Sequence, residues 1–213
     1  MADRFLIPMS CRTAAGALLF SVGVIALMGI VTAETLYPGY STAENAISDL
    51  GATLPPDSIV VEPSATIFNT TMIASGILVV AAAWCVHRAF RDRIVTFFLA
   101  LFGAGVLGVG IFPGYWGDVH GIFALLAFSA GGLAAVAAYR VEPPPLRYFS
   151  VILGAVSLSD LALYFIMGLS ASPFGVFGLG GLERWIAYPI LLWVTGFGGW
   201  LMGGEGKRIA ERS

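Results

Sequence analysis

Six long apolar stretches run along this chain of 213 residues and constrain its fold more than any other feature. Each is roughly 18–22 residues long, close to the ~20 residues that an α-helix needs to cross the hydrocarbon core of a bilayer. The stretches are Ala14–Ala33, Ala65–Val86, Ile94–Phe112, Val119–Tyr139, Tyr148–Leu169 and Leu182–Met202. They predict an all-α membrane protein built as a bundle of six transmembrane helices.

The basic residues fall almost entirely in alternate connections between these stretches. Ten of the eleven share one side of the predicted membrane: Arg4, Arg12, Arg88, Arg91, Arg93, Arg140, Arg147, Lys207, Arg208 and Arg212. Only Arg184 lies on the other side. Connections rich in Lys and Arg stay in the cytoplasm. The distribution therefore predicts a multi-pass protein of the plasma membrane with both termini cytoplasmic.

The composition leaves little room for anything besides this bundle. Mean hydropathy is +0.87 and 11% of residues are charged, whereas about a quarter is usual in a globular domain. We therefore expect residues 1–213 to form a single six-span domain without a soluble catalytic module. The outer side is acidic, which disfavours nucleic acid as a partner. The expected partners are membrane lipid and other membrane proteins.

The first outer connection, from Glu34 to Ser64, is long for a compact protein and is typical of a functional or disordered loop. Ser41 and Glu44 fit a helix capping box, and Gly51 fits a C-terminal cap. Between them an apolar face carries Ala43, Ala46, Ile47 and Leu50. We predict a short helix over Ser41–Gly51 that packs this face on the bundle.

Polar side chains gather near the outer ends of several spans and predict a polar layer there. Because Asp118 and His120 open the fourth span, the loop helix is expected to bring its polar residues close to them. Carboxylates and an imidazole can bind a metal or act as acid and base, but they also cap helix ends. Glu183 and Arg184 are expected to pair locally. The candidate ligand-binding residues are Asn45, Ser48, Asp49, Asn69, Asp118, His120, Asp160 and Glu183.

Asp160 stands apart because it falls near the middle of the fifth span. A charged carboxylate there costs ~2.5–3.5 kcal/mol on insertion scales, so we expect it to face the bundle interior. It would be either an ion, proton or substrate site, or a neutral carboxyl that joins helices by hydrogen bonds. The expected partners are Tyr164, Tyr188, and Thr71 or Ser75.

No motif in the chain indicates a metal or a cofactor. His87 and His120 belong to opposite ends of the bundle, ~30 Å apart, so they cannot together ligate a haem. Cys11 and Cys85 are expected to be free thiols in a reducing cytosol.

A glycine motif in the third span also has a structural explanation. Gly103-Ala104-Gly105-Val106-Leu107-Gly108 matches the dinucleotide fingerprint, but it lies inside an apolar span and lacks the strand that this motif requires. We expect Gly103, Gly110 and the pair Gly199 and Gly203 to let helices approach closely.

The outer helix ends carry a family resemblance. The stretches are YPGYSTAENAISDLGA, IFNTTMIASGIL, GVGIFPGYWGDVHGIFALLAF and GGLERWIAYPILLWVTGFGG. They resemble domain of unknown function 998, a prokaryotic membrane family. The resemblance implies a six-span bundle and implies no activity.

A more distant resemblance concerns the segment AENAISDLG. It is similar to the opening of the alkaline ceramidase and progestin-receptor-like membrane hydrolases, which use a Ser, an Asp and three His around zinc. The resemblance implies that Ser48, Asp118 and His120 would correspond to the Ser, the Asp and one of the three His. The remaining histidines have no counterpart here, and six spans replace seven.

Three functions remain open from the sequence. The first is a binding or accessory protein, rather than an enzyme, that holds a lipid or small molecule in the outer-leaflet half of the bundle. The second is a metal-assisted lipid hydrolase embedded in the membrane. The third is an ion or proton carrier that uses Asp160.

The predicted topology can be tested by cysteine labelling in intact cells. In a background without Cys11 and Cys85, a membrane-impermeant maleimide should label Asp57→Cys from outside and miss Arg91→Cys. Equal labelling of the two variants would contradict the topology.

Overall fold

The computed structural model describes residues 10–210, with side chains for residues 10–203. Four of the ten basic residues used in the topology argument lie beyond these limits. Arg4 and Arg212 fall outside the described residues, and the side chains of Lys207 and Arg208 are not described.

Six long helices dominate the described residues, which contain no strand. All six are long and apolar enough to cross a membrane, which confirms the predicted six-span bundle. They are α1 (Cys11–Thr35), α2 (Ser64–Phe90), α3 (Arg93–Ile111), α4 (Asp118–Ala137), α5 (Leu146–Met167) and α6 (Gly178–Ala210). Four short 3₁₀ helices lie in the connections: η1 (Ser48–Leu50), η2 (Gly114–Trp116), η3 (Ala138–Arg140) and η4 (Pro173–Phe177).

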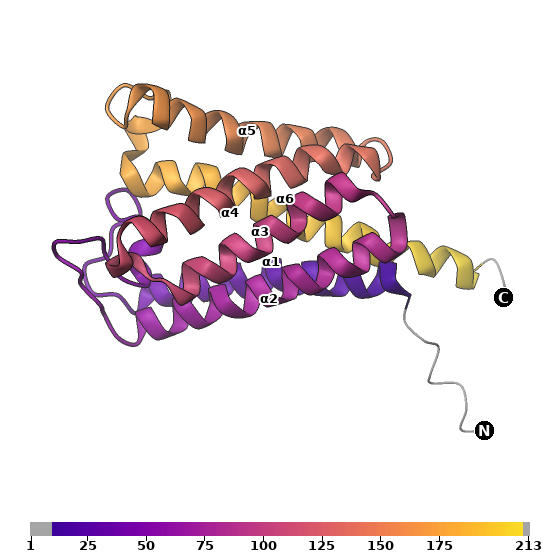
Figure 1. Cartoon of the computed structure of the whole chain (residues 1–213), viewed down its shortest axis with the longest axis horizontal. Helices are drawn as coiled ribbons and strands as arrows, with labels where there is room; N and C mark the ends of the chain where they lie inside the picture. The colour runs from indigo at the N-terminus through magenta and orange to yellow at the C-terminus, as the bar shows by residue number, and fades with distance from the viewer. Residues whose placement is uncertain (1–9, 211–213) are drawn as a thin grey trace.

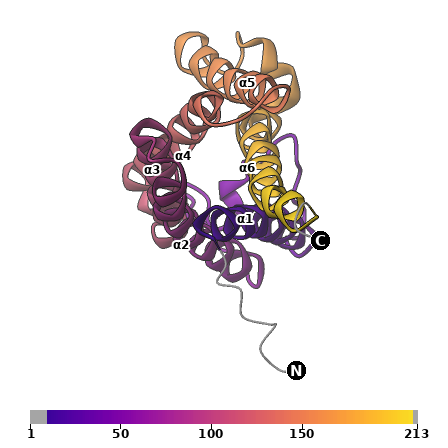
Figure 2. The same ribbon diagram turned by 90° about the vertical axis from the view of Figure 1, so that its right-hand side faces the viewer.

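The helices run side by side along the long axis of the molecule (Figure 1). Each packs against the next helix in the chain, and α6 returns to pack against α1. Viewed along the axis they form a ring, in which α5 lies outermost between α4 and α6 (Figure 2). The first and last spans are therefore neighbours.

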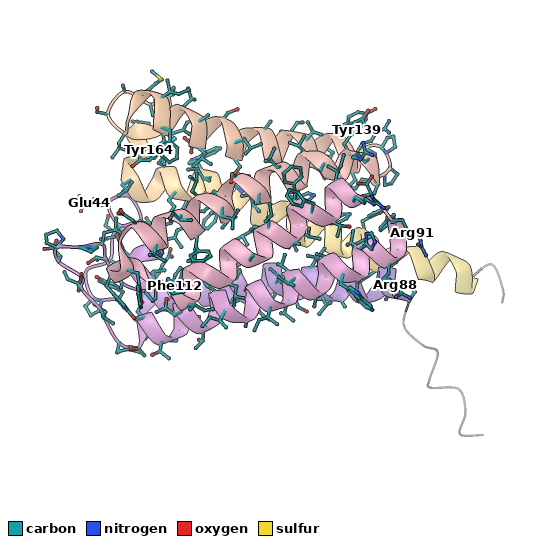
Figure 3. All side chains as sticks on the ribbon, in the orientation of Figure 1. Glu44, Arg88, Arg91, Phe112, Tyr139 and Tyr164 are labelled. Atoms are coloured by element: carbon teal, nitrogen blue, oxygen red, sulfur yellow. The ribbon has the colours of Figure 1, made fainter. Side chains whose placement is uncertain are left out.

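The two ends of the bundle differ in what they carry. Glu44 and Phe112 lie at one end, and Arg88, Arg91 and Tyr139 lie at the other (Figure 3). The long connection between α1 and α2 lies at the first end, which we call the loop end. The second, which we call the terminal end, contains the start of α1 and the last residues of α6 (Figure 1). Which end faces the cytoplasm stays a prediction from the basic residues.

Side chains at the helix termini fix where the spans begin. The Ser10 hydroxyl accepts the Thr13 N–H at 3.2 Å and caps α1. Asp92 Oδ1 accepts the Ile94 and Val95 N–H groups at 3.0 and 3.1 Å and caps α3. An N-cap acceptor satisfies backbone donors that have no partner inside the helix.

Glycine lets α3 approach its two neighbours, as the sequence predicts. A Cβ added to Gly103 would lie 2.9 Å from Val80 N on α2, and one added to Gly105 would lie 2.5 Å from Ala127 N on α4. Gly110 is equally close to the α2 backbone at Asn69. Small residues at such contacts allow backbones to pack directly on one another.

The prediction for Gly199 and Gly203 is wrong. A Cβ on Gly203 would meet nothing within 4 Å, and one on Gly199 would only touch the Phe20 ring. The contact between α6 and α1 uses Gly198 instead, whose Cβ would lie 2.5 Å from Phe20 N. The spacing of the glycines therefore predicted a close approach by α6 but assigned it to the wrong residues.

Large apolar side chains lie both in the core of the bundle and on its outer surface. Trp193 and Phe197 stack at 5.5 Å in the core, whereas Ile122, Phe165 and Leu192 are largely exposed. A soluble monomer rarely exposes apolar surface on this scale. The exposed faces are suited to contact with acyl chains.

Candidate functional site

The connection between α1 and α2 folds over the loop end, but only part of it is helical. The expected helix over Ser41–Gly51 is confined to η1, Ser48–Leu50. Two contacts take up groups that a longer helix would pair with each other. Asp49 Oδ2 accepts the Ala46 N–H at 2.9 Å, and Arg184 Nη1 donates to the Thr42 carbonyl at 2.9 Å. Asp competes with helices in this way. Asn45 Oδ1 accepts the Ser41 N–H at 2.9 Å, a donor at the start of the segment that has no partner inside a helix.

The apolar side of this segment still packs on the bundle. Ile47 and Leu50 are buried, at 5% and 0% exposure, whereas Ala43 is exposed. Ile47 and Leu50 join a core cluster with Ile30, Phe68 and neighbouring side chains. The predicted docking of the loop is therefore correct for its second half and wrong for Ala43.

A central cavity of about 90 Å³ lies beneath this segment. One water needs roughly 10–15 Å³, so the cavity has room for a larger molecule. Its walls come from α1, α2, α3, α4 and α6, and Ile47 and Ser48 of the loop close it. It reaches from Ile30 to Val22 of α1, eight residues or about 12 Å along the axis. None of the lining residues comes from α5.

The cavity wall is apolar apart from three side chains. Ser48 and Glu183 lie near the loop, and Ser75 lies deeper on α2. The Ser75 hydroxyl is buried and has no hydrogen-bond partner among the described residues. A buried polar group without a partner is costly, so this hydroxyl is available to a water or a ligand.

Glu183 is held at the cavity by the loop backbone. The Ile47 N–H donates to Glu183 Oε2, and the Ser48 N–H lies next to the same carboxyl group. Arg184 does not form the expected local pair with Glu183. Adjacent helical residues point about 100° apart because a turn takes 3.6 residues, so Glu183 faces the cavity while Arg184 faces the loop.

Arg184 joins the loop to the bundle through its whole guanidinium group. Its Nη1 donates to the carbonyls of Thr42 at 2.9 Å, Gly180 at 2.8 Å and Asn45 at 3.3 Å. Its Nη2 forms an ion pair with Glu34 at 2.5 Å and donates to the Tyr40 hydroxyl at 2.9 Å. The sequence did not predict this cluster, although Arg184 was conspicuous as the one basic residue of its side.

His120 is buried beside Asp49, as the predicted polar layer requires. It is 4% exposed, and its Nδ1 lies 2.8 Å from the Phe112 carbonyl. Asp49 is close enough for its charge to act on His120. Burial raises the pKa of Asp49, and the Ala46 N–H opposes that rise. The contact with Phe112 joins the start of α4 to the end of α3, and the imidazole lies outside the cavity lining.

Two further candidate residues, Asn69 and Asp118, do not line the cavity. Asn69 Nδ2 donates to the Gly51 carbonyl at 3.4 Å, so it ties α2 to the loop. Asp118 begins α4 and is exposed, where its charge favours the helix N-terminus. Of the eight candidates, Ser48 and Glu183 line the cavity, and the others do not.

Asp160 is fully buried in the protein, at 0% exposure. Among the described residues, neither carboxyl oxygen of Asp160 has a hydrogen-bond partner, so the expected hydrogen bonds do not form there. Tyr188 lies beside Arg184, Thr71 packs against Gly29, and Ser75 faces the cavity. The neighbouring Ser157 hydroxyl is equally buried and unpartnered.

A family comparison now bears on these features. A protein-family model described as "Protein of unknown function (DUF998)" matches residues 20–200. The chain belongs to this family. With its six spans it is an integral membrane protein of unknown function. No curated protein and no solved structure matches the chain significantly.

This DUF998 chain does not assemble the hydrolase residues suggested by the distant resemblance. Ser48 lines the cavity, His120 bonds the Phe112 carbonyl, and Asp118 is exposed. In the part of the chain with described side chains, no three His, Cys, Asp or Glu residues are grouped as metal ligands. The contacts give the catalytic arrangement no support.

Sequence reasoning also missed a polar cluster at the terminal end. Glu142, in the connection to α5, is buried next to the Ser150 hydroxyl and the Trp193 indole N–H. Burial raises the pKa of Glu142, and the nearby Ser150 and Trp193 groups oppose the rise, although none of the three side chains has a hydrogen-bond partner of normal geometry among the described residues. The one signal in the sequence was an acidic residue in a connection that otherwise carries basic residues, and it does not reveal burial.

Replacing Arg184 by lysine should loosen the loop while keeping the positive charge. Lysine offers a point charge instead of a planar fork, so the loop carbonyls of Thr42 and Asn45 lose their Arg184 donor. We expect faster amide hydrogen exchange over residues 41–51 and a loss of unfolding free energy of about 1–3 kcal/mol. Arg93→Lys, at an exposed position, is the control. Unchanged loop exchange in Arg184→Lys would show that the fork is dispensable.

Proposed function

We propose that this protein binds a lipid or other small apolar molecule in the central cavity. The observation that carries the proposal is an apolar cavity closed by the loop, with a carboxyl group and a hydroxyl at one end. Binding sites for small molecules are typically apolar concavities with a few placed polar groups. On the topology predicted from the basic residues, this site lies in the outer-leaflet half of the plasma membrane, with both termini cytoplasmic.

A groove on the lipid-facing surface supports a membrane origin for the ligand. It lies between α1 and α6 and is lined by Gly23, Leu27, Tyr188, Leu191, Leu192 and Thr195. Leu191 lines both the groove and the central cavity. The two spaces are therefore neighbours across Leu191, and the proposed route for a molecule dissolved in the bilayer passes this side chain rather than the loop.

The cavity can be tested with a neutral long-chain alcohol that carries a diazirine in its chain. Saturable photolabelling of the cavity residues Met72 and Phe102, located by mass spectrometry, is the expected result. Ala187→Phe places a ring in the cavity and should remove most of this labelling. Ala155→Phe, the same change on an exposed face of α5, should retain it. Labelling that never saturates, or that ignores Ala187→Phe, would contradict the proposal.

A second candidate function is proton or ion transport through Asp160. It is favoured by one observation, the full burial of a carboxyl group whose two oxygens have no described partner. Ionisable groups inside membranes commonly mark ion or proton pathways.

Transport can be measured in liposomes that contain a pH-sensitive dye. Asp160→Asn keeps the size of the side chain but cannot ionise, so the proton flux should fall to that of empty liposomes. Asp57→Asn, in the exposed loop, should leave the flux unchanged. Equal flux in the wild type and Asp160→Asn would exclude a transport role for Asp160.

A further inference from the structure

The Glu183 carboxyl group has no cation of its own, although the one basic residue of the loop end is its neighbour in sequence. Arg184 donates hydrogen bonds to three carbonyls and to the Tyr40 hydroxyl, and it forms an ion pair with Glu34. Among the described residues, Glu183 forms no ion pair, and its hydrogen bonding comes from the loop backbone at Ile47 and Ser48.

Arg184 is the positive charge that acts on Glu183, but it is already paired with Glu34. Asp49 and Arg184 act on Glu183 electrostatically, and Glu34 neutralises Arg184. Tyr188 lies on the Arg184 side. The walls around the carboxyl group are apolar, with Ile30, Ile47 and Ala187 among them. A carboxylate in such a setting is costly unless a positive charge or strong donors accompany it.

We propose that the ligand of this cavity is a single-chain amphiphile with a cationic amine head, and that Glu183 holds this head. This inference rests on the proposed function, because it needs the cavity to be a binding site. The Ser48 hydroxyl is positioned as the second polar contact. The tail follows the apolar wall toward Val22, Phe102 and the deeper hydroxyl of Ser75.

The geometry also predicts discrimination by charge. An ammonium group gains the full attraction of the carboxylate in a cavity of low dielectric constant. An alcohol of the same chain length can donate a hydrogen bond but brings no charge. A fatty acid anion is repelled. The expected order of affinity is therefore amine, then alcohol, then carboxylate.

The test is competition against the photolabelling alcohol described above, with n-octylamine, n-octanol and octanoate at neutral pH. In the wild type, n-octylamine should compete about tenfold or more better than n-octanol, and octanoate should be weakest. In Glu183→Gln the amide still accepts the loop N–H, so the site should remain labelled while the advantage of the amine disappears. Glu44→Gln, an exposed change in the same loop, should keep the wild-type order.

The outcomes separate this inference from the proposed function. If the wild type shows no saturable labelling, the binding site itself is wrong. If labelling is saturable but amine and alcohol compete equally in both the wild type and Glu183→Gln, the cavity binds ligands without a charged head, and the inference is overturned. An amine preference that survives in Glu183→Gln would place its origin elsewhere and overturn it as well.

Discussion

The guanidinium group of Arg184 is the contact on which the loop end depends. One side chain on α6 bonds three carbonyls, a hydroxyl and a carboxylate that belong to α1, the loop and its own helix. The loop carbonyls have few other donors at this place, and a buried carbonyl without a donor is costly. Because Arg184 fixes the loop backbone, the Ile47 N–H reaches Glu183, and the central cavity acquires both its roof and its polar end.

The fold followed from the sequence because the membrane imposes strong rules on length and composition. Six apolar stretches predicted six helices, and the chain has them. The helix expected over Ser41–Gly51 formed only in part, because hydrogen bonds between side chains and backbone determine the conformation of a loop. Asp49 accepts the Ala46 N–H, which a helix from Ser41 would pair with the Thr42 carbonyl, and the helix is confined to one 3₁₀ turn at Ser48–Leu50. No periodicity reveals such a competition.

The candidate site was predicted in part, for a similar reason. The position of each residue along its span predicted its depth in the membrane, but it did not predict the direction of its side chain. Ser48 and Glu183 line the cavity, Asn69 ties down the loop, and Asp118 is exposed. Direction depends on helix rotation, which packing contacts such as Gly105 against Ala127 determine. Arg184 and Glu183, adjacent in sequence, therefore face different groups: Arg184 bonds the loop and α1, and Glu183 lines the cavity.

The polar groups that lack partners are concentrated away from the cavity. The described residues hold eleven buried side-chain atoms without a hydrogen-bond partner, and seven of them belong to Glu142, Ser150, Ser157, Asp160 and Trp193. These residues lie on α5, just before it, or on α6, which packs against it. No described residue of α5 lines the cavity. The proposed ligand site and Asp160 thus lie in two different parts of one bundle, so a change in one need not disturb the other.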